Sequence, residues 1–456
     1  MSKQLDDLRQ LCPIFTDPEI LESHGKDATE DLMFVPLAVL EPENVEQIQD
    51  VMRYCNNNEM AVYTRGAGTG LCGAALPVNG GVVLSTKRLN KILEIDEKNF
   101  MATVEPGVIN YHFRQAVEAL GLFYPPDPAS YGSCSLGGNV AHSSGGPKCV
   151  KYGTTKDYVL NLEVVLPSGE VIWTGANTVK NSTGFNLTQL MVGSEGLLGV
   201  VTKIVFKLLR KPATDILMLA GFKTALDACN VVNDIMMSGV VPSACELMHS
   251  EGLRLSSGAT QIPFDIANDI EFYLMVELDG DNMDLLMQDA EMIFPCFEKH
   301  GSAEVLFADT AEQKDKWWRL RRAIGEVVKQ KSIYKEEDTV VPRYAMPEVF
   351  DIVDKVKAEY GFEAVCYGHA GDGNIHINIL KNDLNDDYWN NEVPKGITKI
   401  FERCKELGGT ISGEHGIGLV QKDYLPIVFN QTHMELMRGI KKTFDPKGIL
   451  NPGKWL

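Results

Sequence analysis

The stretch Arg65–Gly73 constrains the fold of this chain more than any other. It reads Arg-Gly-Ala-Gly-Thr-Gly-Leu-Cys-Gly and contains a Gly-x-Gly-x-x-Gly motif at Gly68, Gly70 and Gly73. In a Rossmann-type dinucleotide fold, such a loop follows a strand and opens directly into a helix whose N-terminus faces the pyrophosphate. The residues after Gly73 therefore decide whether that fold is allowed.

No helix is predicted after the glycine loop. A short strand at residues 61–64 precedes it, but Pro77, Gly80 and Gly81 follow it, and strands are predicted next at residues 82–85, 92–95 and 101–104. This order excludes a Rossmann-type NAD site. A glycine loop between strands can bind a phosphate through its backbone N–H groups, or it can be a plain glycine-rich turn, and the motif alone leaves both open.

Size, charge and cysteine spacing exclude several classes of protein. The length of 456 residues predicts two or three domains, and no apolar run approaches the roughly 18 residues of a membrane span. The N-terminus lacks a secretory or transit pattern, so a soluble, cytoplasmic protein is expected. The net charge of -19 argues against nucleic acid or an anionic membrane as the main partner. The ten cysteines form no Cys-x-x-Cys pair, which argues against an iron–sulfur cluster or zinc ribbon.

Small residues dominate the stretch from Pro125 to Gly153, which shows no helical or strand periodicity. Such a length is unusual inside a compact domain unless it has a function, and small residues let the backbone approach a flat ligand closely. A plain surface loop is the alternative. A second glycine-rich segment, Gly193–Gly199, leads into a strand predicted at residues 200–208.

A domain boundary is predicted at Arg210-Lys211-Pro212, because the pattern beyond it changes to alternating strands and helices. That alternation predicts an open antiparallel sheet with helices on one face. The predicted strands span 216–222, 270–278 and 303–307, and the predicted helices span 224–238, 284–300, 311–331 and 347–360.

A hairpin is predicted at Tyr367–Asn378, with Asp372-Gly373 as a two-residue turn. His369 and His376 then lie on adjacent arms, and Asn378 faces the same side as His376 because side chains alternate along a strand. Two imidazoles and a carboxylate from Glu414, in the segment Gly413-Glu414-His415-Gly416, are expected to meet on a metal. Each histidine taken singly could equally be a structural side chain.

These motifs together resemble the FAD-dependent D-2-hydroxy-acid dehydrogenases, which include D-lactate, glycolate and D-2-hydroxyglutarate dehydrogenases of the vanillyl-alcohol-oxidase superfamily. The resemblance covers nearly the whole chain in order. It rests on the glycine loop, on the segments Gly132–Asn139 and Gly193–Gly199, on His369–His376, on Gly413–Gly418 and on the tail Asp445–Pro452.

The resemblance implies an α+β, two-domain flavoprotein of the vanillyl-alcohol-oxidase type. An FAD-binding domain would comprise residues 1–212 and a returning C-terminal segment, 409–456, while residues 213–408 would form a cap domain with an antiparallel sheet covered by helices. Because the glycine loop holds no histidine for covalent attachment, the FAD is expected to dissociate. The cofactor-binding positions implied are Arg65, Gly66, Ala67, Gly68, Thr69, Gly70, Pro125, Asp127, Ser135, Gly138, Asn139, Gly145, Gly146, Glu195, Gly199, Val200 and Asn451.

The implied reaction oxidises a 2-hydroxy acid by hydride transfer from C2 to flavin N5. A divalent metal held by His369, His376 and Glu414 would polarise the substrate hydroxyl and carboxylate, and the ligand set suits zinc, manganese or iron. His415 would be the general base, because histidine ordinarily titrates near neutral pH. Asn378 would bind substrate or orient a ligand, although a role in stabilising the hairpin is equally plausible.

The substrate carboxylate needs a cation. Arg321 lies on an apolar stripe of the helix at 311–331, where an arginine either reaches the surface or points into a pocket, and the resemblance favours the pocket. Lys335 matches a second position of the family. The spacing from Arg321 to Lys335 is one residue shorter than in the hydroxyglutarate members, and Gly325 replaces a threonine. A small acid, D-lactate, is therefore favoured over D-2-hydroxyglutarate or glycolate.

Two other classes of function stay open. A metal-dependent hydrolase could use the same two histidines and glutamate, and a flavoprotein subunit could relay electrons without oxidising an acid. For the dehydrogenase, an electron-transferring flavoprotein is the expected acceptor of electrons. No nucleic-acid partner and no transmembrane segment are expected, and homo-oligomerisation is left open.

Overall fold

The computed structural model describes residues 2–456, and the chain divides into two compact units. Unit 1 comprises the residues up to Gly145 together with Thr154–Lys211 and Glu414–Leu456, and unit 2 comprises Gly146–Gly153 and Pro212–Gly413. The sequence placed the boundaries after residues 212 and 408. The structure puts them after 211 and 413, and it assigns the short segment 146–153 to unit 2 as well.

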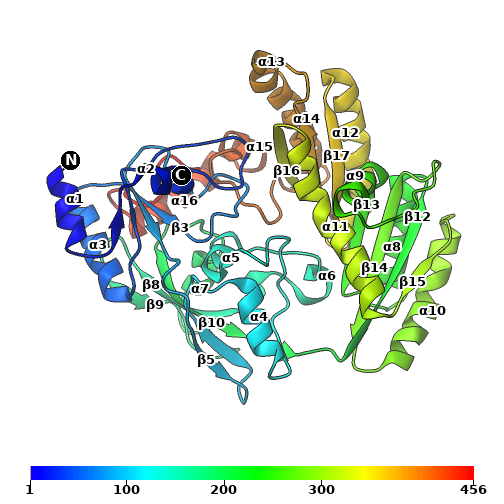
Figure 1. Ribbon diagram of the computed structural model, residues 1–456, viewed down its shortest axis with the longest axis horizontal. Helices are drawn as coiled ribbons and strands as arrows, with labels where there is room; N and C mark the ends of the chain where they lie inside the picture. Colours follow the sequence, from blue (N-terminus) through cyan, green and yellow to red (C-terminus); the bar gives the residue numbers. More distant parts are fainter. Residues whose placement is uncertain (1) are drawn as a thin grey trace. The chain divides into compact units, whose positions relative to one another are not determined.

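Unit 1 contains two main sheets (Figure 1). In the first, β2, β4 and β3 are parallel and β1 is antiparallel, in the order β1-β2-β4-β3. In the second, all strands are antiparallel, in the order β5-β6-β10-β8-β9. Their bounds are β1 Ile14–Phe15, β2 Ala38–Leu40, β3 Val62–Arg65, β4 Val82–Ser85, β5 Ile92–Asp96, β6 Met101–Val104, β8 Val159–Val165, β9 Val171–Trp173 and β10 Val200–Lys207; β7 Leu122–Phe123 pairs with β11 Leu209–Arg210.

The helices of unit 1 pack beside these sheets. Helix α3 begins after Asn44, whose side chain accepts a hydrogen bond from the Gln47 amide at 2.9 Å, and it buries Ile48, Val51, Met52 and Cys55 in one core with the first sheet. The helices are α1 Ser2–Arg9, α2 Pro18–His24, α3 Val45–Asn57, α4 Asn110–Glu118, α5 Leu136–His142, α7 Leu187–Met191, α15 Leu425–Val428 and α16 Gln431–Phe444.

Helices interrupt the stretch of small residues that was predicted to be irregular. Ser135 caps α5 by accepting a hydrogen bond from the Gly138 amide, and α6, Cys149–Tyr152, follows a few residues later. Both helices are too short to show the 3.6-residue period by which a helix is recognised in a sequence, and α5 also contains two glycines and an alanine. In contrast, no helix follows the glycine loop between residues 66 and 81, as predicted.

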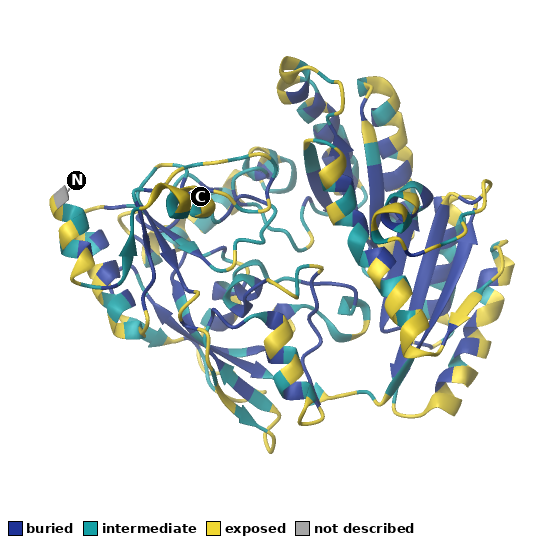
Figure 2. Cartoon of the chain, in the orientation of Figure 1, coloured by how far each residue is buried: buried dark blue, intermediate teal, exposed yellow. Residues whose placement is uncertain are grey.

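Unit 2 is built on one seven-stranded, fully antiparallel sheet in the order β15-β12-β14-β13-β17-β18-β16. Apart from the edge strand β15, its strands are buried along most of their length (Figure 2). The strands are β12 Thr214–Phe222, β13 Ala244–His249, β14 Phe272–Gly280, β15 Leu306–Ala308, β16 Tyr334–Val340, β17 Glu363–His369 and β18 Asn374–Leu380.

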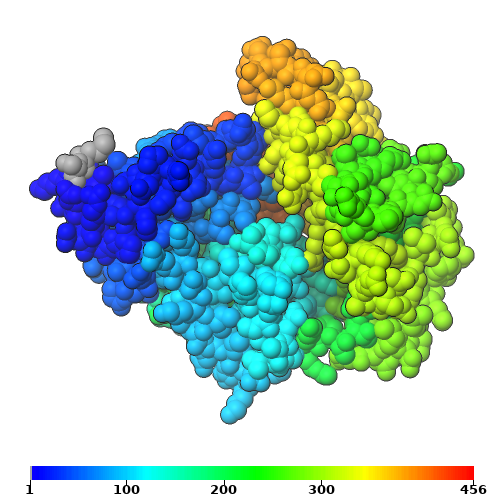
Figure 3. Space-filling model, viewed as in Figure 1, coloured from blue at the N-terminus to red at the C-terminus, as the bar shows by residue number. Residues whose placement is uncertain are grey.

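Helices cover both faces of this sheet, so the prediction of helices on one face was wrong. On one face, α9 and α11 lie side by side over a core that includes Met275, Ile324 and Tyr367 (Figure 3). On the other, the rings of Phe222 and Phe272 pack on α10 and α12. The helices of unit 2 beyond α6 are α8 Ala225–Met237, α9 Ser250–Thr260, α10 Met283–Lys299, α11 Ala311–Lys331, α12 Met346–Tyr360, α13 Asp386–Asn391 and α14 Val393–Glu406.

The segment 146–153 is fastened to strand β14. Lys148 forms an ion pair with Glu277, and Lys151 forms one with Asp279 at 2.6 Å. The Tyr152 hydroxyl donates to the same Asp279 carboxylate at 2.9 Å. These buried carboxylates explain why a segment flanked by unit 1 on both sides belongs to unit 2. Within residues 2–456, no helix has the length and apolar character needed to cross a membrane.

Candidate active site

The glycine loop after β3 brings the backbone close to neighbouring side chains. Gly68 has φ +76°, and a Cβ there would lie 2.1 Å from the Arg65 guanidinium; a Cβ on Gly66 would lie 2.3 Å from Ser135 Oγ. Among the described residues, the backbone N–H groups of residues 66–70 have no protein acceptor. Five consecutive amides of this kind form a nest for an anion.

Arg65 adds a buried cation to this loop. Its side chain is 8% exposed, Nη2 donates to the Ser23 carbonyl at 3.4 Å, and Nη1 has no acceptor among residues 2–456. Burial lowers the pKa of Arg65, and the charge of Asp27 opposes that effect. A guanidinium with an unused buried donor fits a diphosphate, so loop and arginine together fit the pyrophosphate of FAD.

Two other predicted segments meet at α5 in unit 1. The amides of Gly193 and Glu195 donate to the carbonyls of Val140 and Ala141, both at 2.9 Å. Buried Asn139 accepts a hydrogen bond from Asn110 at 3.1 Å. A Cβ on Gly199 would lie 2.4 Å from Val164, so Gly199 allows β10, with Val200, to start against β8. The glycine-rich segments therefore form one assembly beside the loop.

Two of the predicted cofactor residues use their side chains to hold this assembly together. Glu195 accepts hydrogen bonds from the amides of Ile417 and Gly418, at 2.8 and 2.7 Å. Asn451 accepts from the Thr64 amide at 3.1 Å and donates to the Gly196 carbonyl at 2.8 Å. Their polar groups are thus committed to the backbone of unit 1, and we assign them a supporting role.

The remaining residues predicted to bind the flavin lie in different parts of the structure. Pro125 and Asp127 are buried, and Asp127 lies 3.8 Å from the Arg114 guanidinium. The Gly145 amide donates to the Glu414 carboxylate at 3.0 Å within unit 1, whereas Gly146 belongs to unit 2.

The predicted histidine hairpin exists in unit 2 as β17 and β18, but its turn differs. The strands end at His369 and Asn374, so the connection is the four residues 370–373 and the predicted two-residue turn was wrong. His369 pairs with Asn374 and His376 with Tyr367, which puts both histidines on the same face of the sheet. Their ring centroids are 5.3 Å apart, and a ring nitrogen of each lies within 4.8 Å of the other.

Glu246 holds the first of these histidines. It lies on β13 opposite His369, its side chain is fully buried, and one carboxylate oxygen is 2.8 Å from His369 Nδ1. Burial acts to raise the pKa of Glu246, but the charges of His369 and Arg321 outweigh it and hold that pKa below its usual value. With Nδ1–H donated to Glu246, Nε2 is the ring nitrogen of His369 that could bind a metal.

Arg321 points into the molecule from α11. It is 5% exposed, and Nη2 lies 2.6 Å from the same Glu246 carboxylate. Its guanidinium stacks over the Tyr367 ring at 4.9 Å, and its Nε has no acceptor within the described chain. The structure therefore brings Arg321, His369 and His376 to one face of the sheet, with Nε of Arg321 left as a donor for a ligand.

Asn378 shares this face, and Lys335 does not. Asn378 is fully buried and donates to the Tyr367 hydroxyl at 3.2 Å. In the β16–β18 register, Glu336 is opposite Asn378 while Lys335 is opposite Ile379, so Lys335 faces the other side. Its ammonium lies over the Trp389 ring at 5.1 Å. Lys335, predicted to bind substrate, therefore lies on the face of the sheet opposite to the one that carries Asn378.

Glu414, the third predicted metal ligand, and His415, the predicted base, directly follow Gly413, whose backbone is held by a hydrogen bond. Gly413, the last residue of unit 2, donates its amide to the Asp338 carboxylate at 2.8 Å, and Asp338 is the partner of His376 in the β16–β18 register. Glu414 and His415 come next in the chain and lie in a non-helical segment of unit 1.

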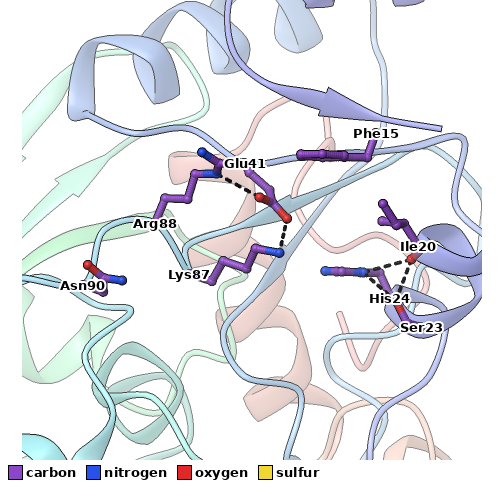
Figure 4. A pocket seen from close by; sticks show the side chains of 8 residues that line it. All are labelled: Phe15, Ile20, Ser23, His24, Glu41, Lys87, Arg88 and Asn90. Carbon is purple, nitrogen blue, oxygen red and sulfur yellow. Dashed lines mark hydrogen bonds and ion pairs between the residues drawn. The ribbon is translucent and has the colours of Figure 1, made fainter. Parts of the chain in front are cut away.

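A separate hollow of about 680 Å³ lies on unit 1 (Figure 4). Its Glu41 forms ion pairs with Lys87 and, at 2.9 Å, with Arg88, so its cations are already neutralised. Burial lowers the pKa of His24, which also lines it. None of the predicted site residues borders this hollow. Its lining residues are Phe15, Ile20, Ser23, His24, Glu41, Lys87, Arg88 and Asn90.

Comparison with known proteins bears on this site. Residues 36–175 match the family model described as "FAD binding domain", and residues 211–455 match "FAD linked oxidases, C-terminal domain". The chain is 38% identical to "Glycolate oxidase subunit GlcD" of Bacillus subtilis, covering 94% of this chain and 91% of that protein. It is 36% identical to "D-lactate dehydrogenase" of Anaerostipes hadrus, covering 94% and 92%.

Two further likenesses complete this comparison. The chain is 32% identical to "D-2-hydroxyglutarate dehydrogenase" of Stutzerimonas stutzeri, covering 99% of this chain and 98% of that protein. The solved structure of p-cresol methylhydroxylase with substrate bound superposes with a TM-score of 0.82 at 19% identity, covering 100% of this chain and 96% of that one. The latter likeness shows a shared two-part α+β fold, and the match to the FAD-binding model identifies the chain as a flavoprotein.

Proposed function

We propose, from the premise that this chain belongs to the FAD-dependent D-2-hydroxy-acid dehydrogenases, that it oxidises a small D-2-hydroxy acid to the 2-oxo acid. FAD-linked oxidation of D-2-hydroxy acids is the activity common to the family. D-lactate is the substrate we favour. The main support is that the Glu246 carboxylate contacts both His369 and Arg321. These contacts place an imidazole and a guanidinium on one buried face of the sheet.

In this reaction the C2–OH group becomes C=O, two electrons leave C2 as hydride and one proton leaves the hydroxyl. FAD supplies the electron acceptor, and a divalent ion, if bound by His369, His376 and Glu414, supplies positive charge for the substrate oxygens. Arg321 binds the substrate carboxylate through its remaining donors. His415 accepts the hydroxyl proton at a ring nitrogen. Asn378 hydrogen-bonds the bound acid and fixes its orientation.

The preference for D-lactate rests on two residues. Lys335 faces away from Arg321 and His376, so it offers no cation to a second carboxylate. A Cβ at Gly325 would lie 2.5 Å from the Tyr367 hydroxyl, so the tyrosine fills space beside α11 that a larger side chain at 325 would take. We propose an electron-transferring flavoprotein as the carrier that reoxidises the FAD.

A visible spectrum tests this function against the alternatives. The protein reconstituted with FAD is expected to be yellow and to lose its flavin absorbance on anaerobic addition of D-lactate. A metal-dependent hydrolase would be colourless, and an electron-relay subunit would stay yellow with every hydroxy acid. Failure to bind FAD, or FAD that no 2-hydroxy acid bleaches, would refute the proposal.

The metal role has its own test. The substitution His376→Ala is expected to remove bound metal and to lower turnover by at least about 100-fold while FAD stays bound, because the flavin nest lies in unit 1. Metal content is measured by elemental analysis and FAD by absorbance. His433→Ala, at an exposed histidine of α16, is the matched control. Unchanged metal content and turnover in His376→Ala would contradict the assignment.

A further inference from the structure

Helix α11 brings two cations to the face of the sheet that carries His369 and His376, and each cation has a buried carboxylate partner. Arg321 pairs with Glu246 at 2.6 Å, and Lys329, two turns later, pairs with Glu336 at 2.5 Å. The two pairs are not equivalent. Arg321 keeps a buried donor without an acceptor among residues 2–456, whereas Lys329 is a single point charge already matched by one carboxylate.

Glu336 occupies the site-facing position of strand β16. It pairs in register with Asn378, and a carboxylate oxygen of Glu336 lies within 4.8 Å of a ring nitrogen of His376. Its side chain is 4% exposed, and the Tyr367 hydroxyl is 3.4 Å from Oε1. A carboxylate therefore stands among the groups proposed to bind the acid, and the neighbouring Lys335 faces the opposite side.

Tyr367 lies next to Glu336 on the same face of the sheet. Its hydroxyl lies between Glu336 and Asn378, and its ring packs under Arg321. Burial and then the charge of Glu336 raise the pKa of Tyr367 well above its usual value, so the phenol stays neutral. The ammonium of Lys329 pairs with Glu336 here, and the Arg321 guanidinium over the ring pairs with Glu246.

We propose that Glu336 is a specificity-determining residue that excludes 2-hydroxy acids with a second carboxylate. This inference rests on the proposed function and refines its substrate class to acids with an uncharged side chain at C2. A second carboxylate placed beside Glu336 would meet a buried like charge, and the Lys329 ammonium is already paired with that same carboxylate. An uncharged methyl or hydroxymethyl group would not be repelled by Glu336 and would not need a cation.

The test compares kcat/KM for D-lactate and D-2-hydroxyglutarate in the FAD- and metal-loaded protein. The wild type is expected to prefer D-lactate by at least about 100-fold. Glu336→Gln is expected to reduce that ratio at least about tenfold, mainly through a lower KM for the dicarboxylate. Glu337→Gln, which alters the adjacent buried glutamate on the opposite face of β16, is the matched control and should leave the ratio unchanged.

A second variant keeps the inference testable if Glu336→Gln folds poorly. Lys329→Met leaves Glu336 without its cation and is expected to lower kcat/KM for D-2-hydroxyglutarate further relative to D-lactate. Wild-type preference for the dicarboxylate, or ratios unchanged in both variants while D-lactate is still oxidised, would overturn the inference alone. Absence of flavin bleaching by any 2-hydroxy acid in the wild type would overturn the proposed function, and this inference with it.

Discussion

Glu246 is the residue that connects the two functions proposed for unit 2. Its carboxylate lies against both the His369 ring and the Arg321 guanidinium, and it is fully buried. A carboxylate that accepts the Nδ1–H of a metal-binding histidine fixes the ring and raises its basicity as a ligand. One negative charge therefore orients a proposed metal ligand and a proposed substrate-binding cation together.

Replacing that charge should weaken metal binding. In Glu246→Gln the amide keeps the shape of the side chain but loses its charge, and we expect metal affinity to fall by about 10–100-fold. Competition with a chelator measures this affinity. Glu277→Gln is the control, because Glu277 is a buried glutamate on the same face of the sheet that pairs with Lys148 and Trp318 instead. Equal chelator resistance in Glu246→Gln and wild type would remove Glu246 from this role.

At the residue scale, the sequence was informative where chemistry and spacing coincide. His369, His376 and Arg321 could be named because glycine-flanked histidines and an arginine on an apolar stripe are unusual. Glu246 could not be named, because it lies 123 residues before His369 and only strand pairing joins them. Lys335 was named from the resemblance to the family, and the alternation of side chains along β16 puts it on the other face.

At the scale of elements, the loop between β3 and β4 depends on one glycine conformation. Gly68→Ala is expected to lower FAD affinity at least about tenfold, because the methyl group would displace the Arg65 guanidinium and alanine is strained at φ +76°. Gly80→Ala is the control: Gly80 has φ +70° but open space around it. Fluorescence titration of the apoprotein with FAD measures both, and equal affinities would contradict the role given to the loop.

Helices and strands were predicted correctly where a periodic pattern extends over many residues. They were missed where tertiary contacts determine the secondary structure. Helix α11 spans the predicted residues, because 21 residues repeat the helical period many times. Strand β16 contains Lys335, Glu336, Glu337 and Asp338 and has no strand signature, yet pairing with β18 and contacts to α11 stabilise it. The four-residue hairpin connection was missed because Asp372-Gly373 by itself favours a tighter turn.

At the scale of the whole molecule, Lys454 links the C-terminal tail to the glycine-loop region of unit 1. Its ammonium donates to the carbonyls of Gly73 and Leu76, at 2.7 and 2.5 Å, and its side chain is almost fully buried. Burial lowers the pKa of Lys454 to about 8, against an opposing effect of Asp27. In the unfolded chain the group titrates near 10.5.

This difference makes stability depend on pH. Between about pH 8 and 10.5 the unfolded chain binds more protons at Lys454, so its contribution to the free energy of unfolding rises with pH, is complete above 10.5 and is lost as pH falls through 8. From pH 7 to 9.5 the wild type should gain about 2 kcal/mol more than Lys454→Met. Denaturant unfolding followed by tryptophan fluorescence measures this gain, and parallel pH curves for the two proteins would contradict it.

The sequence predicted the general architecture, since the fold class and the family follow from motifs spread over the whole chain. It did not predict that residues 146–153 belong to unit 2, because the cause is the pairing of Lys148 and Lys151 with carboxylates on β14, more than 100 positions later. Long-range charge pairing of this kind leaves no periodic pattern in either segment.

During synthesis, unit 1 cannot complete its first sheet until its C-terminal tail has been translated. Asn451 and Leu450 pair with Val62 along the open edge of β3, yet they are translated after all of residues 212–413. At about 5–20 residues per second, those roughly 200 residues take about 10–40 s. Over that interval the ribosome carries a flavin-binding half whose sheet edge is still exposed. The half of the protein that is mostly made first is thus the last to have its sheet completed.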